Sequence, residues 1–232
     1  MGFIVLEGGA EFGGRMAIAD RQAVKLAGGF DSPIRIVPAA AAPDQNHRRA
    51  GKNGVDWFQQ LGATDVSSLD LIDRQSAGNP GIAAELASAR LIFLLGGFPH
   101  YLAQTLHGSR CWQAILEAYS KGAVIAGSSA GAMVLCEHYY DPATSRVHQG
   151  LKLVNGACIL PHHDSFGKDW VPSLRKILAS TTLVGIDEQT GAINDSAPDR
   201  WRVYGKGKIS LYQNNSIRQF FARQGFPLSI KA

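Results

Sequence analysis

The stretch from Val124 to Leu135 constrains the fold of this chain more strongly than any other. It consists of an apolar run at 124–126, a glycine-rich turn at 127–131 and a second apolar run at 132–135. A short apolar run that ends at glycine and is followed at once by another is typical of a buried strand that passes into a helix. Because such strand–helix units stack side by side into one sheet, the stretch predicts an α/β fold.

Comparable units precede it along the chain. Residues 91–95 are apolar throughout and end at a glycine pair, as expected of a strand at the centre of a parallel sheet with both faces covered. The alternation of strands and helices predicts a three-layer, doubly wound and mostly parallel sheet of the flavodoxin-like type. The other predicted strands are 3–6, 34–37 and 65–72, and the predicted helices are 15–26, 43–61, 80–87, 101–106 and 111–119.

After Asp164 the pattern changes. One helix is predicted at 170–178, and the apolar runs beyond it are short and separated by glycines. Such runs indicate antiparallel strands, which we place at one edge of the sheet near the C-terminus. Because no repeat, low-complexity tract or linker interrupts the chain, we predict one α/β domain over residues 1–232. The short runs are 183–186, 192–193, 201–204 and 209–212.

The glycine-rich turn matches the pattern G-x-S-x-G, with Ser129 at its centre. In this pattern a sharp strand-to-helix turn leaves no room for side chains at Gly127 and Gly131, and it exposes the serine above the sheet. The turn also places backbone N–H groups at a helix N-terminus, where they can hold an oxyanion. Because the pattern is short enough to arise by chance, a glycine-rich turn without chemistry is the alternative.

Residues 127–132, Gly-Ser-Ser-Ala-Gly-Ala, resemble the G-[T/S]-S-A-G-A box of the cyanophycinase and dipeptidase E (aspartyl dipeptidase) group of serine peptidases. Three more stretches match this group in the expected order, namely Leu-Leu-Gly-Gly at 94–97, Leu-Pro-His at 160–162 and Gly-Ile-Asp-Glu at 185–188. The resemblance runs from Glu7 to about Tyr212. It implies a fold like that of the class I glutamine amidotransferases, with serine in place of their cysteine. It also implies a serine hydrolase that cleaves a small peptide or isopeptide amide through an acyl-enzyme on Ser129, next to aspartyl residues in the relatives.

A serine nucleophile needs a base and a group that orients the base. Of the seven histidines, His162 and His163 follow an apolar run at 157–160, at a predicted strand end, where open α/β sheets bind ligands. The resemblance implies that His162 is the base and that His163 occupies the position of an aromatic residue. The assignment between the two stays open at this point, and two surface histidines in a loop are the alternative.

The orienting carboxylate is predicted at Glu188. This residue follows the predicted strand 183–186, at the same edge of the sheet as Ser129 and His162, and it belongs to the Gly-Ile-Asp-Glu box of the resemblance. A purely structural role for Glu188, as a cap or an ion-pair partner, is the alternative. Three other acids remain rivals for the catalytic role: Glu137, Asp141 and Asp164.

The oxyanion donors are predicted to be backbone amides, because these are rigid and need no reorganisation. Ala130 N–H belongs to the turn itself, and Gly97 N–H follows the central strand and matches the glycine pair of the family. The glycine-rich segment 8–14 is expected to form another rim of the same pocket. Arg15 and Lys168 lie in rim segments and are candidates for binding a substrate carboxylate, although a residue of this kind is more often a solvated surface charge.

Charge and composition limit the partners. The formal net charge is +4, and the one dense basic run, 47–49 with Lys52, is interpreted as a solvated helix face. We therefore expect no nucleic-acid partner, whereas a small acidic substrate suits the modest positive excess. No His, Cys and Asp residues have zinc spacing, so neither a metal nor a cofactor is expected. The sequence leaves a homodimer open.

Cysteine usage and hydropathy bear on the compartment. Cys111, Cys136 and Cys158 are odd in number, widely spaced and in apolar settings, which indicates free thiols in a reducing compartment. No run approaches 18 apolar residues, so no membrane span is predicted. The first seven residues lack the basic region of a signal peptide. A cytoplasmic protein is the expectation.

Two other classes of function fit part of this pattern. A non-catalytic amidotransferase-like binding protein would keep the fold and leave Ser129 unreactive toward a fluorophosphonate. An esterase of the α/β-hydrolase type would share the turn, but its acid precedes its histidine in the sequence. Glu137 or Asp141 would satisfy that order, and Glu188 would not.

Overall fold

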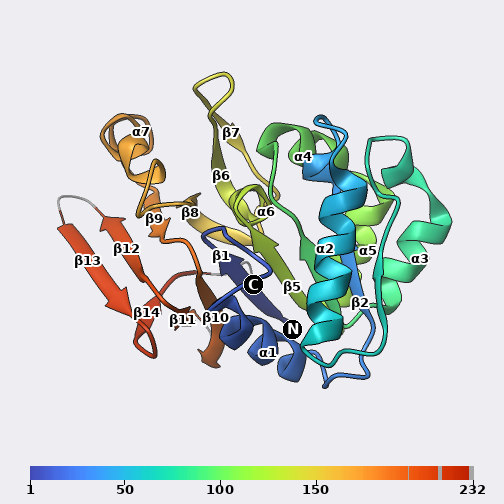
Figure 1. Cartoon of the computed structure of the whole chain (residues 1–232). Coiled ribbons are helices and arrows are strands. Elements are labelled where there is room, and N and C mark those ends of the chain that lie inside the picture. The colour runs from blue at the N-terminus through green and yellow to red at the C-terminus, as the bar shows by residue number, and fades with distance from the viewer. Residues whose placement is uncertain (198, 214–215, 230–232) are drawn as a thin grey trace.

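The structure is a computed structural model that describes residues 1–197, 199–213 and 216–229. These residues form two β-sheets with helices packed around them (Figure 1). The larger sheet has eight strands, in the order β14-β11-β10-β1-β5-β4-β2-β3. In that order they are Gly225–Pro227, Arg200–Gly205, Thr190–Ala197, Phe3–Glu7, Val124–Ser128, Leu91–Leu94, Ile34–Val37 and Val66–Ser68.

The five strands β1, β5, β4, β2 and β3 run parallel and confirm the predicted doubly wound sheet. All four residues of β4 are buried, as a strand covered on both faces requires. Glu7 pairs with Ser128, and Leu94 pairs with Gly127. The carboxyl ends of β1, β5 and β4 therefore meet at one edge of the sheet, and the residues that follow these strands share a site.

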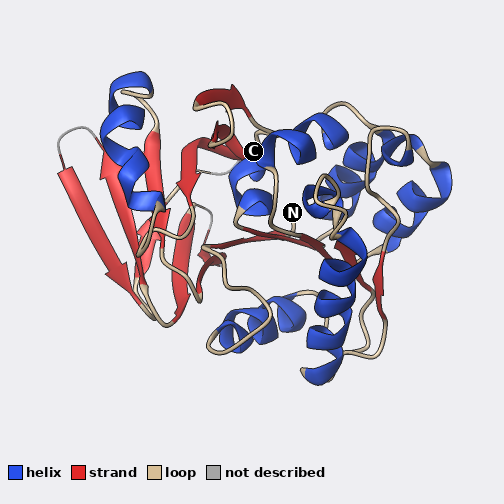
Figure 2. Cartoon of the chain, turned by 45° about the horizontal axis from the view of Figure 1, so that its top comes forward, coloured by secondary structure: helices blue, strands red, loops and turns tan. Residues whose placement is uncertain are grey.

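Helices cover both faces of this sheet (Figure 2). On one face α1 (Met16–Leu26) and α2 (His47–Gln60) enclose a core with Val5, Ile36 and Phe93. On the other face a larger core includes Ile4, Leu6 and Ile92, because alternate residues of a strand point to opposite faces. The helices of that face are α3 (Pro80–Ser88), α4 (Pro99–Leu106), α5 (Arg110–Ser120) and α6 (Ala130–Leu135).

A second sheet of six strands lies beside the first, in the order β13-β12-β9-β8-β6-β7. The helix α7 (Val171–Ile177) packs on it, against Cys158, Leu160 and Leu183. The strands are Ser216–Phe221, Lys208–Gln213, Thr182–Ile186, Val154–Leu160, Cys136–Asp141 and Arg146–Gln149.

This second sheet departs from the simpler arrangement that the sequence predicts. The predicted runs 192–193 and 201–204 lie in β10 and β11, which extend the edge of the first sheet as expected, and β14, which was not predicted, pairs with β11. However, the predicted runs 183–186 and 209–212 lie in β9 and β12 of the second sheet, where β9 runs parallel to β8. The strand β13, which was not predicted, pairs with β12. A pattern of short apolar runs identifies strands but not their partners, because pairing is decided by tertiary packing.

Two predicted elements are shorter than the pattern suggested. The helix predicted at 43–61 begins only at His47, because Gln45 has a φ of 55°, which no right-handed helix accommodates. The strand predicted at 65–72 is reduced to Val66–Ser68. The three cysteines are buried and free, as predicted. Among the described helices, none has both the length and the apolar composition needed to cross a membrane.

A buried pair of carboxyl groups lies beneath the edge where the strands end. Glu7, at the end of β1, is 0% exposed and Asp20 of α1 is 1% exposed. Trp57 Nε1 donates a hydrogen bond of 2.8 Å to Asp20 Oδ2. Burial raises the pKa of Glu7 well above its usual value and raises that of Asp20 to about 6. The folded protein therefore binds protons here that the unfolded chain releases.

This pair predicts a stability that falls as the pH rises. Below the unfolded pKa values of 3.8 and 4.5 both states are protonated. The free energy of unfolding falls as the pH rises from these values toward the raised pKa values of the folded state, about 6 for Asp20, and each contribution levels off above the folded pKa. We expect Glu7→Gln to raise the free energy of unfolding by about 1–2 kcal/mol at pH 8 and by much less at pH 5. Urea denaturation at both pH values measures this, with the exposed Asp70→Asn as control. An equal gain at both pH values would contradict it.

Candidate active site

Ser129 occupies a strained turn between β5 and α6. Its backbone has φ 48° and ψ −113°, a conformation that non-glycine residues adopt only when their surroundings enforce it. The flanking glycines supply those surroundings: a Cβ on Gly127 would lie 2.5 Å from the Gly131 carbonyl carbon, and one on Gly131 would overlap the Leu94 carbonyl oxygen. The Ser129 N–H donates a hydrogen bond of 3.0 Å to the carbonyl of Glu7. The turn thus has the strand–turn–helix geometry that G-x-S-x-G requires.

Three side chains meet in a line at this turn. Ser129 Oγ lies 3.1 Å from His162 Nε2, and His162 Nδ1 lies 2.7 Å from Glu188 Oε1. The His162 side chain is 20% exposed and that of Glu188 is 41% exposed. A carboxylate on one ring nitrogen holds the tautomer in which the other nitrogen accepts a proton. The arrangement can therefore take a proton from the serine hydroxyl.

Three contacts hold His162 in place. The His162 backbone N–H donates a hydrogen bond of 2.7 Å to the carbonyl of Gly8. Phe166 stacks on the ring, with centroids 4.9 Å apart and an angle of 25° between the planes. On the remaining side lies Gly9, where a Cβ would overlap His162 Cε1. Only glycine at position 9 leaves room for the ring.

Glu188 comes from the loop that follows β9 and is itself supported by Asp164. The Glu188 N–H donates a hydrogen bond of 2.9 Å to Asp164 Oδ1. The two other rivals are bound elsewhere. Glu137 accepts from the Gly156 N–H, and Asp141 accepts from the Thr144 hydroxyl. Of the four acids considered from the sequence, the structure brings Glu188 to the histidine.

His163 points away from Ser129. It is 6% exposed, and its Nε2 lies 2.9 Å from the Tyr212 hydroxyl. Its ring packs where a Cβ on Gly185 would be, and burial lowers the pKa of this histidine. The structure therefore places His162 beside the serine and gives His163 a packing position between β9 and β12.

Gly97 and Ala130 are the two residues whose amides are predicted to hold the oxyanion. Ala130 is the first residue of α6, so its N–H has no acceptor within the helix. Gly97 has φ 136°, and a Cβ there would overlap the Ala40 carbonyl. Within the described residues, the N–H of Gly97 donates to no other group. A Cβ on Gly96 would lie 3.3 Å from Ser129 Cβ, so this glycine keeps the approach to the serine open.

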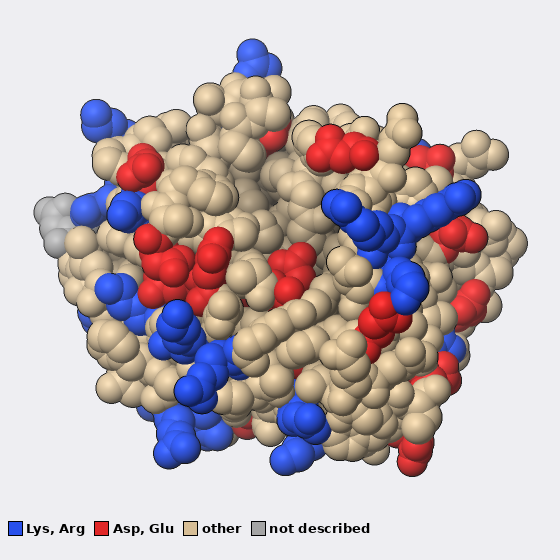
Figure 3. Space-filling view, in the orientation of Figure 1, with Lys and Arg blue, Asp and Glu red and all other residues tan. Residues whose placement is uncertain are grey.

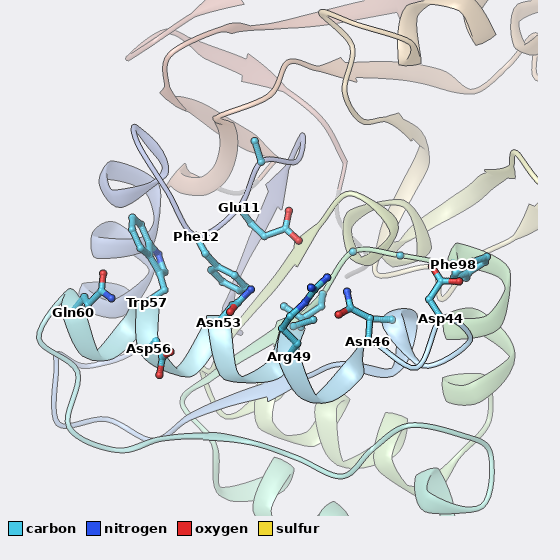
Figure 4. Close-up of a pocket in the computed structure, with 16 residues that line it drawn as sticks. Glu11, Phe12, Asp44, Asn46, Arg49, Asn53, Asp56, Trp57, Gln60 and Phe98 are labelled. Atoms are coloured by element: carbon cyan, nitrogen blue, oxygen red, sulfur yellow. The ribbon is translucent and has the colours of Figure 1, made fainter.

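A cavity of about 800 Å³ opens beside Gly96 and Gly97. Its walls come from the segment 8–14, which the sequence predicted as a rim, and from α2 (Figure 4). Glu11 and Arg49 extend toward its centre from opposite walls. Among the described residues that line it, Arg49 is the one cation, whereas Phe12, Trp57 and Phe98 add aromatic surface.

The two cations proposed from the sequence lie outside this cavity. Arg15 immediately precedes α1, and Lys168 belongs to the 3₁₀ turn Gly167–Trp170; both are exposed, and neither lines the cavity. Their role in binding substrate stays a prediction. Arg49 was missed because the basic run on α2 resembled a solvated helix face. Figure 3 shows both basic and acidic side chains around the hollowed centre of this face.

Metal ligands do not converge in the described part of the chain. No group of three or more His, Cys, Asp and Glu side chains there could hold a metal ion. A hydroxyl, an imidazole and a carboxylate in line, as in Ser129–His162–Glu188, can perform acyl transfer, in which a serine attacks a carbonyl and a histidine carries the proton.

Comparison with known proteins places the chain among peptidases. Residues 4–194 match the family model described as peptidase family S51. The chain is 26% identical over 202 residues to a cyanophycinase of Geminocystis herdmanii (strain PCC 6308), an alignment that covers 82% of this chain and 73% of that protein. Two further cyanophycinases are longer still and are matched over 64% of their length.

Solved structures give the same fold. A peptidase from an acI-B1 Actinobacterium superposes with a TM-score of 0.87 at 28% identity, over 98% of this chain and 97% of that one. A putative peptidase E protein from Listeria monocytogenes EGD-e superposes with a TM-score of 0.64 at 16% identity, over 89% of this chain and 100% of that one. The second likeness concerns the fold alone. Together they support the α/β architecture predicted from the sequence.

Proposed function

This chain belongs to peptidase family S51, and on that premise we propose that it is a serine hydrolase that cleaves a small peptide or isopeptide amide through an acyl-enzyme on Ser129. The observation that carries the proposal is the line of hydrogen bonds from Ser129 Oγ to His162 Nε2 and from His162 Nδ1 to Glu188 Oε1, at 3.1 and 2.7 Å. Nucleophile, base and orienting carboxylate need this geometry.

The proposed reaction has two halves. Ser129 Oγ attacks the carbonyl carbon while His162 Nε2 takes the hydroxyl proton, and the carbonyl oxygen becomes an oxyanion that accepts from the amides of Gly97 and Ala130. The C–N bond then breaks as His162 returns the proton to the leaving amine. Water, deprotonated by His162, attacks the acyl-enzyme and releases the acid and Ser129. Throughout, Glu188 holds the imidazole tautomer and stabilises its charged form.

We further propose that the substrate has an aspartyl residue at the scissile bond and that Arg49 binds its carboxylate. The guanidinium faces a cavity that begins at Gly97, and within the described residues it makes no ion pair or hydrogen bond. A planar guanidinium binds a carboxylate through two parallel hydrogen bonds. Arg49 therefore joins Arg15 and Lys168 as a candidate, with the advantage that it lines the cavity.

The proposal is tested by the intact mass of the protein after incubation with a fluorophosphonate. A single adduct that peptide mapping places on Ser129 is the expected result. A folded protein without an adduct would contradict the proposal and favour the amidotransferase-like binding protein. If an adduct forms, hydrolysis of a dipeptide set with and without aspartate then tests the substrate.

Gly9→Ala is expected to lower the rate of this labelling by about 100-fold, because the new methyl group would displace the His162 ring by roughly an ångström. The φ of Gly9 is 112°, which adds backbone strain. Gly13→Ala is the matched control on the same segment, since a Cβ there would have nothing within 4 Å. Equal labelling rates for the two variants would show that the contact with His162 is unimportant.

A further inference from the structure

A second histidine–carboxylate pair lies next to the pair His162–Glu188. These two residues belong to the segments that follow β8 and β9, and their neighbours on the same segments, His163 and Asp187, face each other as well. His163 Nδ1 lies 3.6 Å from Asp187 Oδ1, and both residues are 6% exposed. The backbone N–H of His163 also donates a hydrogen bond of 3.1 Å to the carbonyl of Ile186. The proposed reaction uses neither of the two buried side chains.

The strand β12 holds both members of this second pair. The Tyr212 hydroxyl lies 2.9 Å from His163 Nε2. The backbone N–H of Lys208 donates a hydrogen bond of 3.1 Å to Asp187 Oδ2, and the Asp187 N–H donates one of 3.2 Å to the Lys208 carbonyl. Because Tyr212 and Lys208 lie on the same strand, the two segments that carry His163 and Asp187 are tied to one common support.

The contacts of the pair define where its proton lies. Asp187 Oδ1 is buried and accepts no hydrogen bond within the described residues. A buried carboxylate oxygen without a donor is costly, so the proton of His163 belongs on Nδ1, which faces this oxygen. Nε2 is then an acceptor, and the Tyr212 hydroxyl donates to it. Burial lowers the pKa of His163, and the nearby charge of Asp187 only partly offsets this, which favours the neutral imidazole that the arrangement requires.

We propose that His163 and Asp187 are positioning residues that fix His162 and Glu188 at the distance that proton transfer from Ser129 needs. This inference rests on the proposed hydrolase function and extends it to residues that do not touch the reacting atoms. The bond of 2.7 Å between His162 and Glu188 joins two separate segments, and the Glu188 side chain is 41% exposed, so packing restrains it little. A misplacement of about 1 Å in such a group can cost about 100-fold in rate.

His163→Phe tests this role. The new ring has a similar size and fills the space beside Gly185, where a Cβ would overlap the present imidazole, but it leaves Asp187 Oδ1 without a donor. We expect kcat for an aspartyl dipeptide and the rate of fluorophosphonate labelling of Ser129 to fall by about 10- to 100-fold. The KM should stay within about twofold, because the substitution disturbs the base and not the binding of substrate.

A second substitution and a control make the test specific. Adding Asp187→Asn to His163→Phe removes the buried unpaired charge, so the double variant should react at least about threefold faster than His163→Phe alone. His148→Phe is the matched control, because this half-buried histidine also belongs to the second sheet and stacks on an aromatic ring, that of Tyr139. It should keep the rate within about twofold of wild type, as expected away from the pair.

Proton NMR supplies a readout that does not depend on turnover. The proton on His162 Nδ1, hydrogen-bonded to Glu188, should give a signal far downfield that is absent from a His162→Gln variant. We expect this signal to shift or to broaden by exchange with water in His163→Phe, to recover in the double variant and to stay unchanged in His148→Phe. Thermal denaturation of the same proteins separates a loss of stability from a loss of alignment.

The outcomes distinguish this inference from the function on which it rests. If wild type is not labelled at Ser129, the hydrolase proposal fails, and the NMR signal alone then decides the positioning role. If His163→Phe lowers the melting temperature but keeps kcat and the NMR signal, or if Asp187→Asn restores nothing, the positioning role is overturned and the hydrolase proposal stands. Should His163→Phe not fold, Tyr212→Phe removes only the outer hydroxyl and should lower kcat about threefold, as the loss of one hydrogen bond would. An unchanged kcat and NMR signal in that variant would overturn the inference.

Discussion

Ser129→Ala is expected to lower kcat for peptide hydrolysis by about 10⁴- to 10⁶-fold and to leave the fold unchanged. The hydroxyl is the atom that would form the acyl-enzyme, and without it only binding and the two amides of Gly97 and Ala130 remain to assist attack by water. The fold should persist because the turn is held by the bond from the Ser129 N–H to Glu7 and by the packing of Gly127 and Gly131.

The measurement is steady-state hydrolysis of an aspartyl dipeptide by wild type and variant, with thermal denaturation to verify the fold. Ser128→Ala is the matched control, because it removes the neighbouring hydroxyl and its bond to Glu11 but leaves Ser129 beside His162. We expect this control to keep activity within about tenfold of wild type, the loss of one hydrogen bond at the edge of the site. A Ser129→Ala protein with normal turnover would eliminate the acyl-enzyme.

Much of the fold follows from local sequence patterns, as β4 and β5 illustrate. Both are apolar runs that end at glycine, and both prove to be fully buried strands of the parallel sheet. Strands β6 and β7 were not predicted, because Cys-Glu-His-Tyr-Tyr-Asp and Arg-Val-His-Gln have neither a continuous apolar run nor a clear alternation. They are stabilised by pairing with each other and with β8, and such long-range pairing leaves little trace in the local pattern.

Of the candidate site, too, only part could be predicted from the sequence. Ser129, His162 and Glu188 each follow a strand at the same edge of the structure, so the pattern of strands already predicted that they would lie close together. Glu11 and Arg49 could not be found in this way. Arg49 is one charge among several on α2. Only the tertiary structure shows that it lines a cavity together with Gly96 and Gly97. Glu11 Oε1 and Ser129 Cβ each lie 3.3 Å from the position of a Cβ on Gly96, a proximity that no local sequence pattern indicates.

The carboxylate of the triad gives the second large effect. Glu188→Gln is expected to lower kcat by about 10³-fold, because a glutamine amide can donate to His162 Nδ1 and so favour the tautomer whose Nε2 cannot accept the serine proton. The expected loss of kcat is smaller than for a fully buried triad carboxylate, since the Glu188 side chain is 41% exposed and water can partly replace it. The measurement is again kcat for an aspartyl dipeptide, with fluorophosphonate labelling as a second readout that does not depend on the substrate.

Three isosteric substitutions make this prediction decisive. Asp164→Asn should cost only a few-fold, because its amide oxygen still accepts from the Glu188 N–H and only part of one charge-assisted hydrogen bond is lost. Glu137→Gln and Asp141→Asn should leave kcat unchanged, since Glu137 accepts a hydrogen bond from the Gly156 N–H and Asp141 accepts one from the Thr144 hydroxyl. A large loss at Glu137 or Asp141 with normal turnover at Glu188 would instead favour the order of an α/β-hydrolase, in which the acid precedes the histidine. The position of the sensitive carboxylate along the chain therefore discriminates between the two kinds of hydrolase that share this serine turn.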